Sequence, residues 1–237
     1  MNLTIMSLTA RAMLGRKRVL MLLPMPIILI GLTLIGVTSG ADDDEWGPVV
    51  FSGLGLSVIL PLTALIIGSS ALGLEIDDGT ITHLLTKPLP RSEIVLSKLA
   101  VAWVVTTVAT GVPLAAAALI GGASKLAVGL VIGAAIGGLA YSALFLALSV
   151  MTKRPVAVGL TYIVLWENLL VSFVDGARIF SVRQHATAIA DSIGDTRLLE
   201  ASVTVTTALI VSVIFIAAGT FGATQRLRSF ALTGEAN

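Results

Sequence analysis

The sequence has no cysteine and few charged residues. Because Cys is absent from all 237 residues, disulfides, thiolate metal sites and cysteine nucleophiles are excluded. Only 12% of the residues are charged, about half of the roughly 25% that is usual in soluble domains. The net charge is +1, so the chain lacks the basic excess that nucleic-acid binding requires, and we expect no nucleic-acid partner.

Catalytic motifs are missing as well. No G-x-x-x-x-G-K-[ST] phosphate loop occurs, and the nearest string, at residues 121–125, lacks its spacing. No G-x-S-x-G nucleophile elbow occurs either. The predicted topology puts His83 and His185 on opposite sides of a membrane, so they cannot share a metal or a proton. We therefore expect no enzyme, no catalytic residue, no metal site and no cofactor within this chain.

Apolar residues are abundant instead. They make up 56% of the chain, and the mean hydropathy is +0.99, too apolar for one soluble core. A membrane span needs about 20 mostly apolar residues, and in lipid each such span must be helical. We predict one all-α integral membrane domain over residues 1–237, with six transmembrane helices at approximately residues 19–37, 48–72, 99–120, 126–151, 155–174 and 201–222.

The basic residues indicate the orientation of these spans. With a cytoplasmic N-terminus, most Lys and Arg fall inside, as the positive-inside rule requires. The inside set is Arg11, Arg16, Lys17, Arg18, Lys87, Arg91, Lys98, Lys153, Arg154, Arg226 and Arg228, and the outside set is Lys125, Arg178, Arg183 and Arg197. Both termini are therefore predicted in the cytoplasm.

A cleaved signal peptide is the alternative for the first span. The basic residues 16–18, an apolar run and the small residues 39–41 imitate one. However, the run at 19–37 exceeds the roughly 7–15 apolar residues of such a signal. We predict a retained span.

Two segments outside the spans have helical periodicity. Residues 3–18 combine apolar positions with Arg11 and Arg16, which predicts an amphipathic helix on the cytoplasmic membrane surface, or else an extension of the first span. In the outer segment 175–200, apolar residues recur at intervals of three and four.

The cytoplasmic segment between the second and third spans contains the most distinctive pattern. Asp78 or Thr80 can cap a helix, and Ile81, Leu84 and Leu85 then share one face. Pro88 ends it, because the residue before proline is pushed out of helical geometry. The pattern predicts a helix of about two turns beyond the membrane, suited to dock in a groove of a partner protein.

This segment resembles the permeases of the second class of ABC exporters. The pattern is Glu-x-x-x-Gly-Thr, then Leu-Leu-Thr-x-Pro, then Arg-x-Glu and a Lys that opens the next span. The matching residues are Glu75, Gly79, Thr80, Leu84, Leu85, Thr86, Pro88, Arg91, Glu93 and Lys98. The layout of surface helix, six spans and outer insertion also resembles that family.

The resemblance implies a bacterial inner-membrane permease that binds separate ABC ATPase subunits, which hold ATP and Mg. It also implies a second permease copy or paralogue, short outer helices before the sixth span, and a coupling helix that transmits ATP-driven movement. The residues implied in coupling are Glu75, Asp78, Gly79, Thr80, Ile81, Leu84, Leu85, Thr86, Lys87, Pro88 and Arg91. An ordinary solvated loop is the alternative.

Two further groups stand out within the spans. Glu167 and Asn168 lie inside the fifth span, where an acid is costly unless it is paired or faces a cavity. They belong either to the translocation path or subunit interface, or to a locally paired structural site. Gly129, Gly133 and Gly137 form overlapping GxxxG units, which allow close helix packing within the chain or between permeases.

Three functions compete on this sequence. The leading one is an ATP-driven exporter of an amphipathic drug, lipid or peptide, in contact with membrane lipids. An ion-gradient-driven secondary transporter or channel is the alternative, although such proteins usually carry several ionisable groups at mid-membrane. A membrane enzyme is disfavoured, because the catalytic groups are missing.

Overall fold

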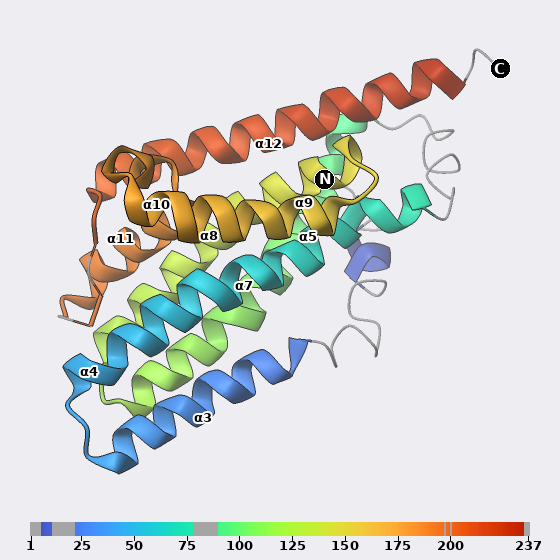
Figure 1. Cartoon of the computed structure of the whole chain (residues 1–237). Coiled ribbons are helices and arrows are strands. Elements are labelled where there is room, and N and C mark those ends of the chain that lie inside the picture. The colour runs from blue at the N-terminus through green and yellow to red at the C-terminus, as the bar shows by residue number, and fades with distance from the viewer. Residues whose placement is uncertain (1–5, 11–21, 78–89, 197, 200, 235–237) are drawn as a thin grey trace.

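The computed structural model describes residues 6–10, 22–77, 90–196, 198–199 and 201–234. Every regular element in these ranges is a helix, which confirms the predicted all-helical class (Figure 1). The elements are α3 (Pro24–Ser39), α4 (Asp43–Pro48), η1 (Val49–Ile59), α5 (Leu60–Asp77), α7 (Arg91–Ile120), α8 (Ser124–Met151), α9 (Pro155–Thr161), η2 (Tyr162–Leu170), α10 (Val171–Phe173), η3 (Asp175–Phe180), α11 (Val182–Gly194) and α12 (Val205–Gly234).

Five helical stretches are long and apolar enough to cross a membrane. They are Asp43–Gly73, Arg91–Ile120, Ser124–Met151, Pro155–Phe173 and Val205–Ser229. α3 is apolar but shorter, with 16 residues, and residues 11–21 before it lie outside the described ranges. The structure thus supports a multi-pass membrane protein, while the first of the six predicted spans stays a prediction.

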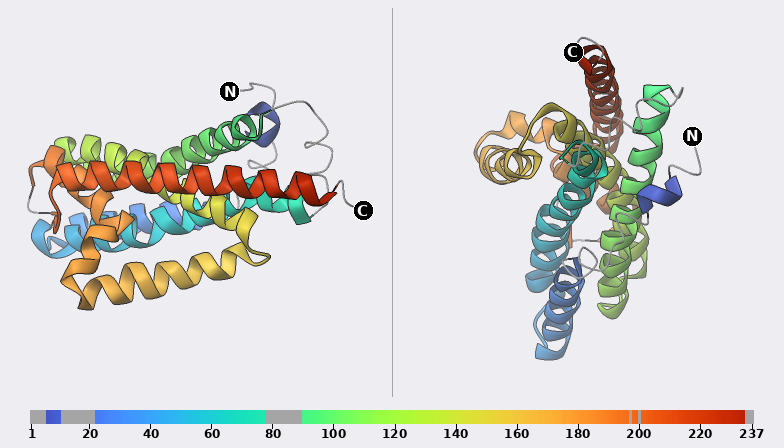
Figure 2. Two further views of the ribbon diagram at one scale, coloured as in Figure 1. Left: turned by 90° about the horizontal axis from the view of Figure 1, so that it is seen from above. Right: turned by 90° about the vertical axis from the view of Figure 1, so that its right-hand side faces the viewer.

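The long helices run roughly side by side around α8 (Figures 1 and 2). α8 packs against α5, α7, α11 and α12, and α9 to α10 lie at one edge of the bundle. We call the end at which Asp43, Asp44 and Glu45 lie the acidic end. The opposite end, at which Lys153 and Arg226 border one cavity, is the basic end.

The core around α8 combines small residues, aromatic rings and a few internal hydrogen bonds. The rings of Tyr141 and Phe145 stack with centroids 5.8 Å apart, and Tyr162 meets Phe145 edge-on at 6.4 Å. The indole N–H of Trp103 on α7 donates to the carbonyl of Ala135 on α8 at 2.8 Å. Such interhelical bonds matter in lipid, where helices gain little from apolar contact alone.

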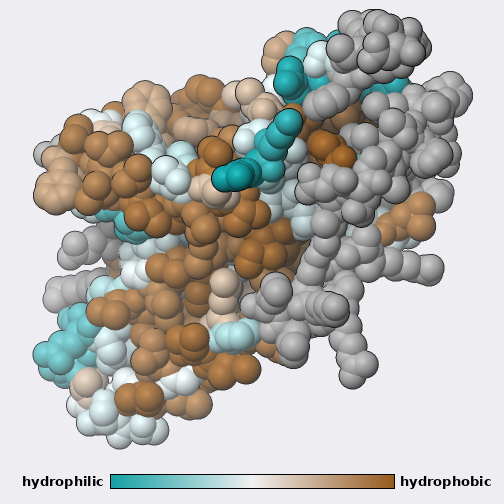
Figure 3. Space-filling model, turned by 45° about the vertical axis from the view of Figure 1, so that its right-hand side comes forward, coloured by the Kyte–Doolittle hydropathy of each residue, from teal (hydrophilic) through white to brown (hydrophobic). Residues whose placement is uncertain are grey.

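The face of the bundle seen in Figure 3 is largely apolar between its two ends. Val104, Val108 and Val112 of α7 are exposed, as are Val213 and Phe221 of α12. Such stripes are costly in water and suit the hydrocarbon of a bilayer.

Some helix boundaries differ from the predicted spans. The third helix begins at Arg91, eight residues before the predicted span at 99, and Lys98 is buried within it. The last helix begins at Val205 rather than at 201. Of the predicted surface helix, residues 6–10 are helical and the rest lies outside the described ranges. The outer segment contains η3 and α11.

Candidate functional site

The predicted coupling segment lies mostly outside the described residues. The structure describes its flanks, the end of α5 and the start of α7. Arg91 is half-buried at the first position of α7. The predicted coupling residues that fall outside are Asp78, Gly79, Thr80, Ile81, Leu84, Leu85, Thr86, Lys87 and Pro88.

A buried ion pair joins the two flanks. The ammonium group of Lys98 on α7 lies 2.6 Å from a carboxylate oxygen of Glu75 on α5. The same ammonium donates a second hydrogen bond, 2.7 Å long, to the carbonyl of Ala71. Lys98 is 1% exposed and Glu75 is 31% exposed. Because each helix carries one partner, the ion pair holds the end of α5 and the start of α7 together, on either side of the segment that connects them.

The polar site in the fifth span centres on Glu167, which is fully buried. The hydroxyl of Tyr162 donates to Oε1 at 3.1 Å, and the backbone N–H of Val182 donates to the same oxygen at 3.0 Å. The hydroxyl of Ser181 donates to Oε2. Ser181 also caps α11, accepting from the backbone N–H of Gln184 at 3.2 Å. The positive end of α11 therefore meets the carboxylate, a favourable arrangement for a buried acid.

The winding of η2 brings this site together. Tyr162 and Glu167 are five residues apart, which places side chains on different faces of an α-helix. η2 is a π-helix, whose wider turn joins residues five apart. Asn168 makes a contact of the same i, i+5 spacing, because its side-chain N–H donates to the carbonyl of Ile163 at 2.9 Å. Glu167 is buried whereas Asn168 is exposed, so these two predicted residues lie on different faces.

Replacing Glu167 tests how strongly this site holds α11. In Glu167→Leu the donors of Tyr162, Ser181 and Val182 lose their acceptor, and we expect the free energy of unfolding to fall by about 2 kcal/mol. Glu167→Gln keeps one acceptor oxygen and is expected to cost less. Thermal unfolding of the purified chain in detergent measures both. If the leucine variant is as stable as wild type, this site does not hold α11.

The three predicted packing glycines lie along α8, and all three face α11. A Cβ at Gly133 would lie 2.5 Å from the carbonyl oxygen of Ala186, and one at Gly137 would lie 2.8 Å from the Ala186 methyl group. At Gly129 the obstructing atom is the carbonyl oxygen of Ala190. The glycine stripe therefore lets α11 approach the backbone of α8 within one chain.

A single methyl group on this stripe is expected to displace α11. Gly133→Ala should lower the free energy of unfolding by about 1–3 kcal/mol, the usual cost of overpacking. Gly222→Ala on α12 is the matched control, because nothing lies within 4 Å of its would-be Cβ and alanine favours a helix. The two variants are compared by thermal unfolding in the same detergent. Equal stability of both would contradict the close approach.

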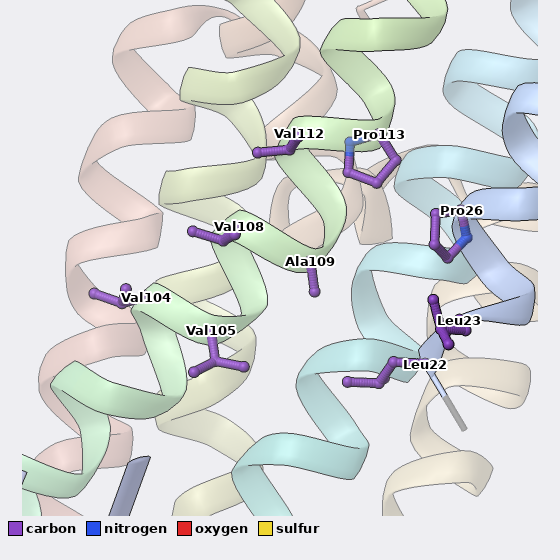
Figure 4. Close-up of a pocket in the computed structure, with 9 residues that line it drawn as sticks. All are labelled: Leu22, Leu23, Pro26, Val104, Val105, Val108, Ala109, Val112 and Pro113. Carbon is purple, nitrogen blue, oxygen red and sulfur yellow. The ribbon is translucent and has the colours of Figure 1, made fainter. Parts of the chain in front are cut away.

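An apolar groove lies between α3 and α7 (Figure 4). It has a volume of about 460 Å³ and no polar residue in its lining. Leu23 and Pro26 lie on the α3 side and face Val105, Ala109 and Pro113 of α7. A groove of this composition accepts hydrocarbon and offers no group that would bind an ion.

Three polar side chains that form these hydrogen bonds, or one nearby, were not predicted from the sequence: Tyr162, Ser181 and Ser57. Tyr162 and Ser181 bind Glu167, and Ser57 on η1 accepts a hydrogen bond from Arg183 at 3.0 Å. A helical pattern gave no signal for Tyr162, because the i, i+5 contact depends on the π-helix. Ser181 carried a recognisable signal, since serine before an apolar periodic segment is a typical helix cap.

The chain matches a known protein family. The family's description is "ABC-2 family transporter protein", and the match covers residues 16–174, more than half of the 237 residues. The matched range includes Glu75, Lys98, the glycine stripe and Glu167. No curated protein sequence matches the chain.

Proposed function

Because the chain belongs to the ABC-2 transporter family and is one of its permease subunits, we propose that it forms the export path of an ATP-driven complex with a separate ATPase. ATP and Mg bind to that ATPase. The single observation that carries the proposal is the family match, which extends across the segment between α5 and α7. The absence of a phosphate loop from the sequence agrees with an ATPase on another polypeptide.

The proposed coupling runs through the base of that segment. A force applied to residues 78–89 reaches α5 and α7 together, because the Glu75–Lys98 ion pair joins them. α5 and α7 both pack against the central α8, so their joint movement is passed to the core of the bundle. In this proposal the coupling residues between α5 and α7 form the contact with the ATPase, as the family resemblance implies.

The proposed setting is the inner membrane of a bacterium, with both termini in the cytoplasm. The excess of Lys and Arg at the basic end supports this orientation. A second permease, identical or related, completes the path, and lipids cover the exposed valine and isoleucine side chains.

The proposed cargo is an amphipathic molecule such as a drug, a lipid or a peptide. The groove between α3 and α7 supports this class, because its lining is apolar throughout. The buried acid Glu167 is already bound by three local donors, which gives little support to an ion-gradient mechanism.

Reconstitution of the chain with the ATPase encoded beside it tests the proposal. We expect movement of a fluorescent phospholipid across the vesicle membrane to require ATP and to continue when ionophores collapse all ion gradients. Transport that stops with ionophores and ignores ATP would instead identify a secondary transporter.

A further inference from the structure

A polar cavity opens near the acidic end of the bundle, where η1, α10, η3 and α11 meet. Its volume is about 570 Å³, within the range of small-molecule sites. Most of its lining residues are polar, in contrast to the groove between α3 and α7. The polar side chains are Ser52, Ser172, Arg178, Arg183, Gln184 and Ser202.

Arg183 is the unusual member of this lining. The residue before it, Val182, donates its backbone N–H to the buried Glu167, so Arg183 lies next to that polar site. Arg183 itself is partly buried. A partly buried cation is costly unless it is paired or faces a polar environment.

The contacts of Arg183 use little of its donor capacity. One nitrogen of its guanidinium donates to the hydroxyl of Ser57 at 3.0 Å, and Ser57 is uncharged. Within the described residues, its Nε is buried without a hydrogen-bond partner, and so is Oε1 of the neighbouring Gln184. A guanidinium carries five N–H donors, and buried donors are normally satisfied by protein, water or ligand.

Glu167, which Val182 binds, forms no salt bridge with this guanidinium. Both oxygens of Glu167 accept from Tyr162, Ser181 and the N–H of Val182. Among the residues that the structure describes, no carboxylate forms a salt bridge with Arg183. The guanidinium of Arg183 therefore gives the cavity a positive charge. An oxyanion bound there would accept hydrogen bonds from the guanidinium's unpaired donors.

We propose that this cavity binds the phosphate or carboxylate group of an anionic amphiphile, the cargo of the exporter, with Arg183 as its principal ligand. Arg178 and Gln184 line the same cavity and lie beside the bound group. Guanidinium groups suit oxyanions, because their planar N–H donors match pairs of oxygen atoms. This inference rests on the proposed function, and it narrows the cargo from any amphipathic molecule to an anionic one.

Binding of decyl phosphate to the full chain in phosphatidylcholine nanodiscs tests the site. We expect saturable binding that weakens about tenfold or more in Arg183→Gln, because a charge-assisted hydrogen bond is lost. Arg154→Gln, at the basic end, is the matched charge control and should bind as wild type does. Equal affinity in Arg183→Gln and wild type would overturn the proposal.

Further variants separate folding from binding. Ser57→Ala removes the tether and keeps the charge, so we expect it to bind more tightly than Arg183→Gln. If Arg183→Gln fails to fold, Arg183→Lys replaces it, and we expect its affinity to lie below that of wild type. Undiminished affinity in a folded Arg183→Lys and in Arg178→Gln together would then overturn the proposal.

Two more measurements distinguish the source of the anion and the role of the site. Inorganic phosphate should bind more weakly than decyl phosphate, and equal affinities would overturn an amphiphile as ligand. In the complex with its ATPase, decyl phosphate should stimulate ATP hydrolysis in wild type but not in Arg183→Gln. Binding without stimulation would reject the ligand as cargo, whereas an active ATPase complex that binds no decyl phosphate would reject the site and leave the proposed function intact.

Discussion

Exchange of residues 80–87 for a Gly/Ser linker of equal length is expected to abolish the stable complex between this chain and its ATPase. The exchange removes the apolar positions Ile81, Leu84 and Leu85, together with Lys87. Those side chains are the ones proposed to dock on the partner, and a docked amphipathic helix binds through its apolar positions. Co-purification through a tag on this chain measures the loss.

The control for this exchange lies at the opposite end of the bundle. Residues 121–123, in the short connection between α7 and α8, are replaced with Gly-Gly-Ser, which keeps glycine at position 122, where φ is +74°. This variant should retain the ATPase and its hydrolysis rate. A complex of undiminished yield and transport after the exchange of residues 80–87 would refute the proposed coupling role.

Removal of one partner of the Glu75–Lys98 ion pair is expected to have the second large effect. In Glu75→Ala the ammonium of Lys98, which is 1% exposed, keeps the carbonyl of Ala71 as an acceptor but loses its counter-charge. Breaking a buried pair costs about 3–5 kcal/mol, and we expect the lower end because Glu75 is 31% exposed. Unfolding of the chain in mixed micelles with increasing dodecyl sulfate measures this difference.

A double variant separates the charge from the packing. Glu75→Gln combined with Lys98→Met leaves no unpaired charge in the core, so it should recover most of the stability that Glu75→Ala loses. Glu45→Gln, an exposed carboxylate at the acidic end, is the control and should unfold as wild type does. A Glu75→Ala protein as stable as this control would show that the ion pair does not join α5 to α7.

The helical class and most of the span positions followed from the sequence, because long apolar runs in lipid have few structural solutions. The ion pair between the second and third spans could not be predicted in the same way. The pattern placed Glu75 near the end of the second span and Lys98 at the opening of the third, but nothing in it indicates that the two side chains pair. A paired charge and a solvated charge look alike in the sequence.

Only part of the polar site around Glu167 could be predicted from the sequence. The acid drew attention by its depth, but its neighbour Asn168 points to a different face. Ser181 and Arg183 reach the site or its surroundings because the chain turns back after α10 and α11 packs along the glycines of α8. This fold-back of the chain depends on tertiary packing and on the π-helical geometry of η1 and η2. The sequence contains no periodic pattern that indicates either the packing or the π-helices.

Native mass spectrometry of the intact particle, purified from its own cells through a tag on this chain, tests the central claim most directly. The account predicts a particle in which permease chains are accompanied by ABC ATPase subunits and in which ATP is hydrolysed. A homogeneous particle that contains only membrane-spanning chains and hydrolyses no ATP would contradict it.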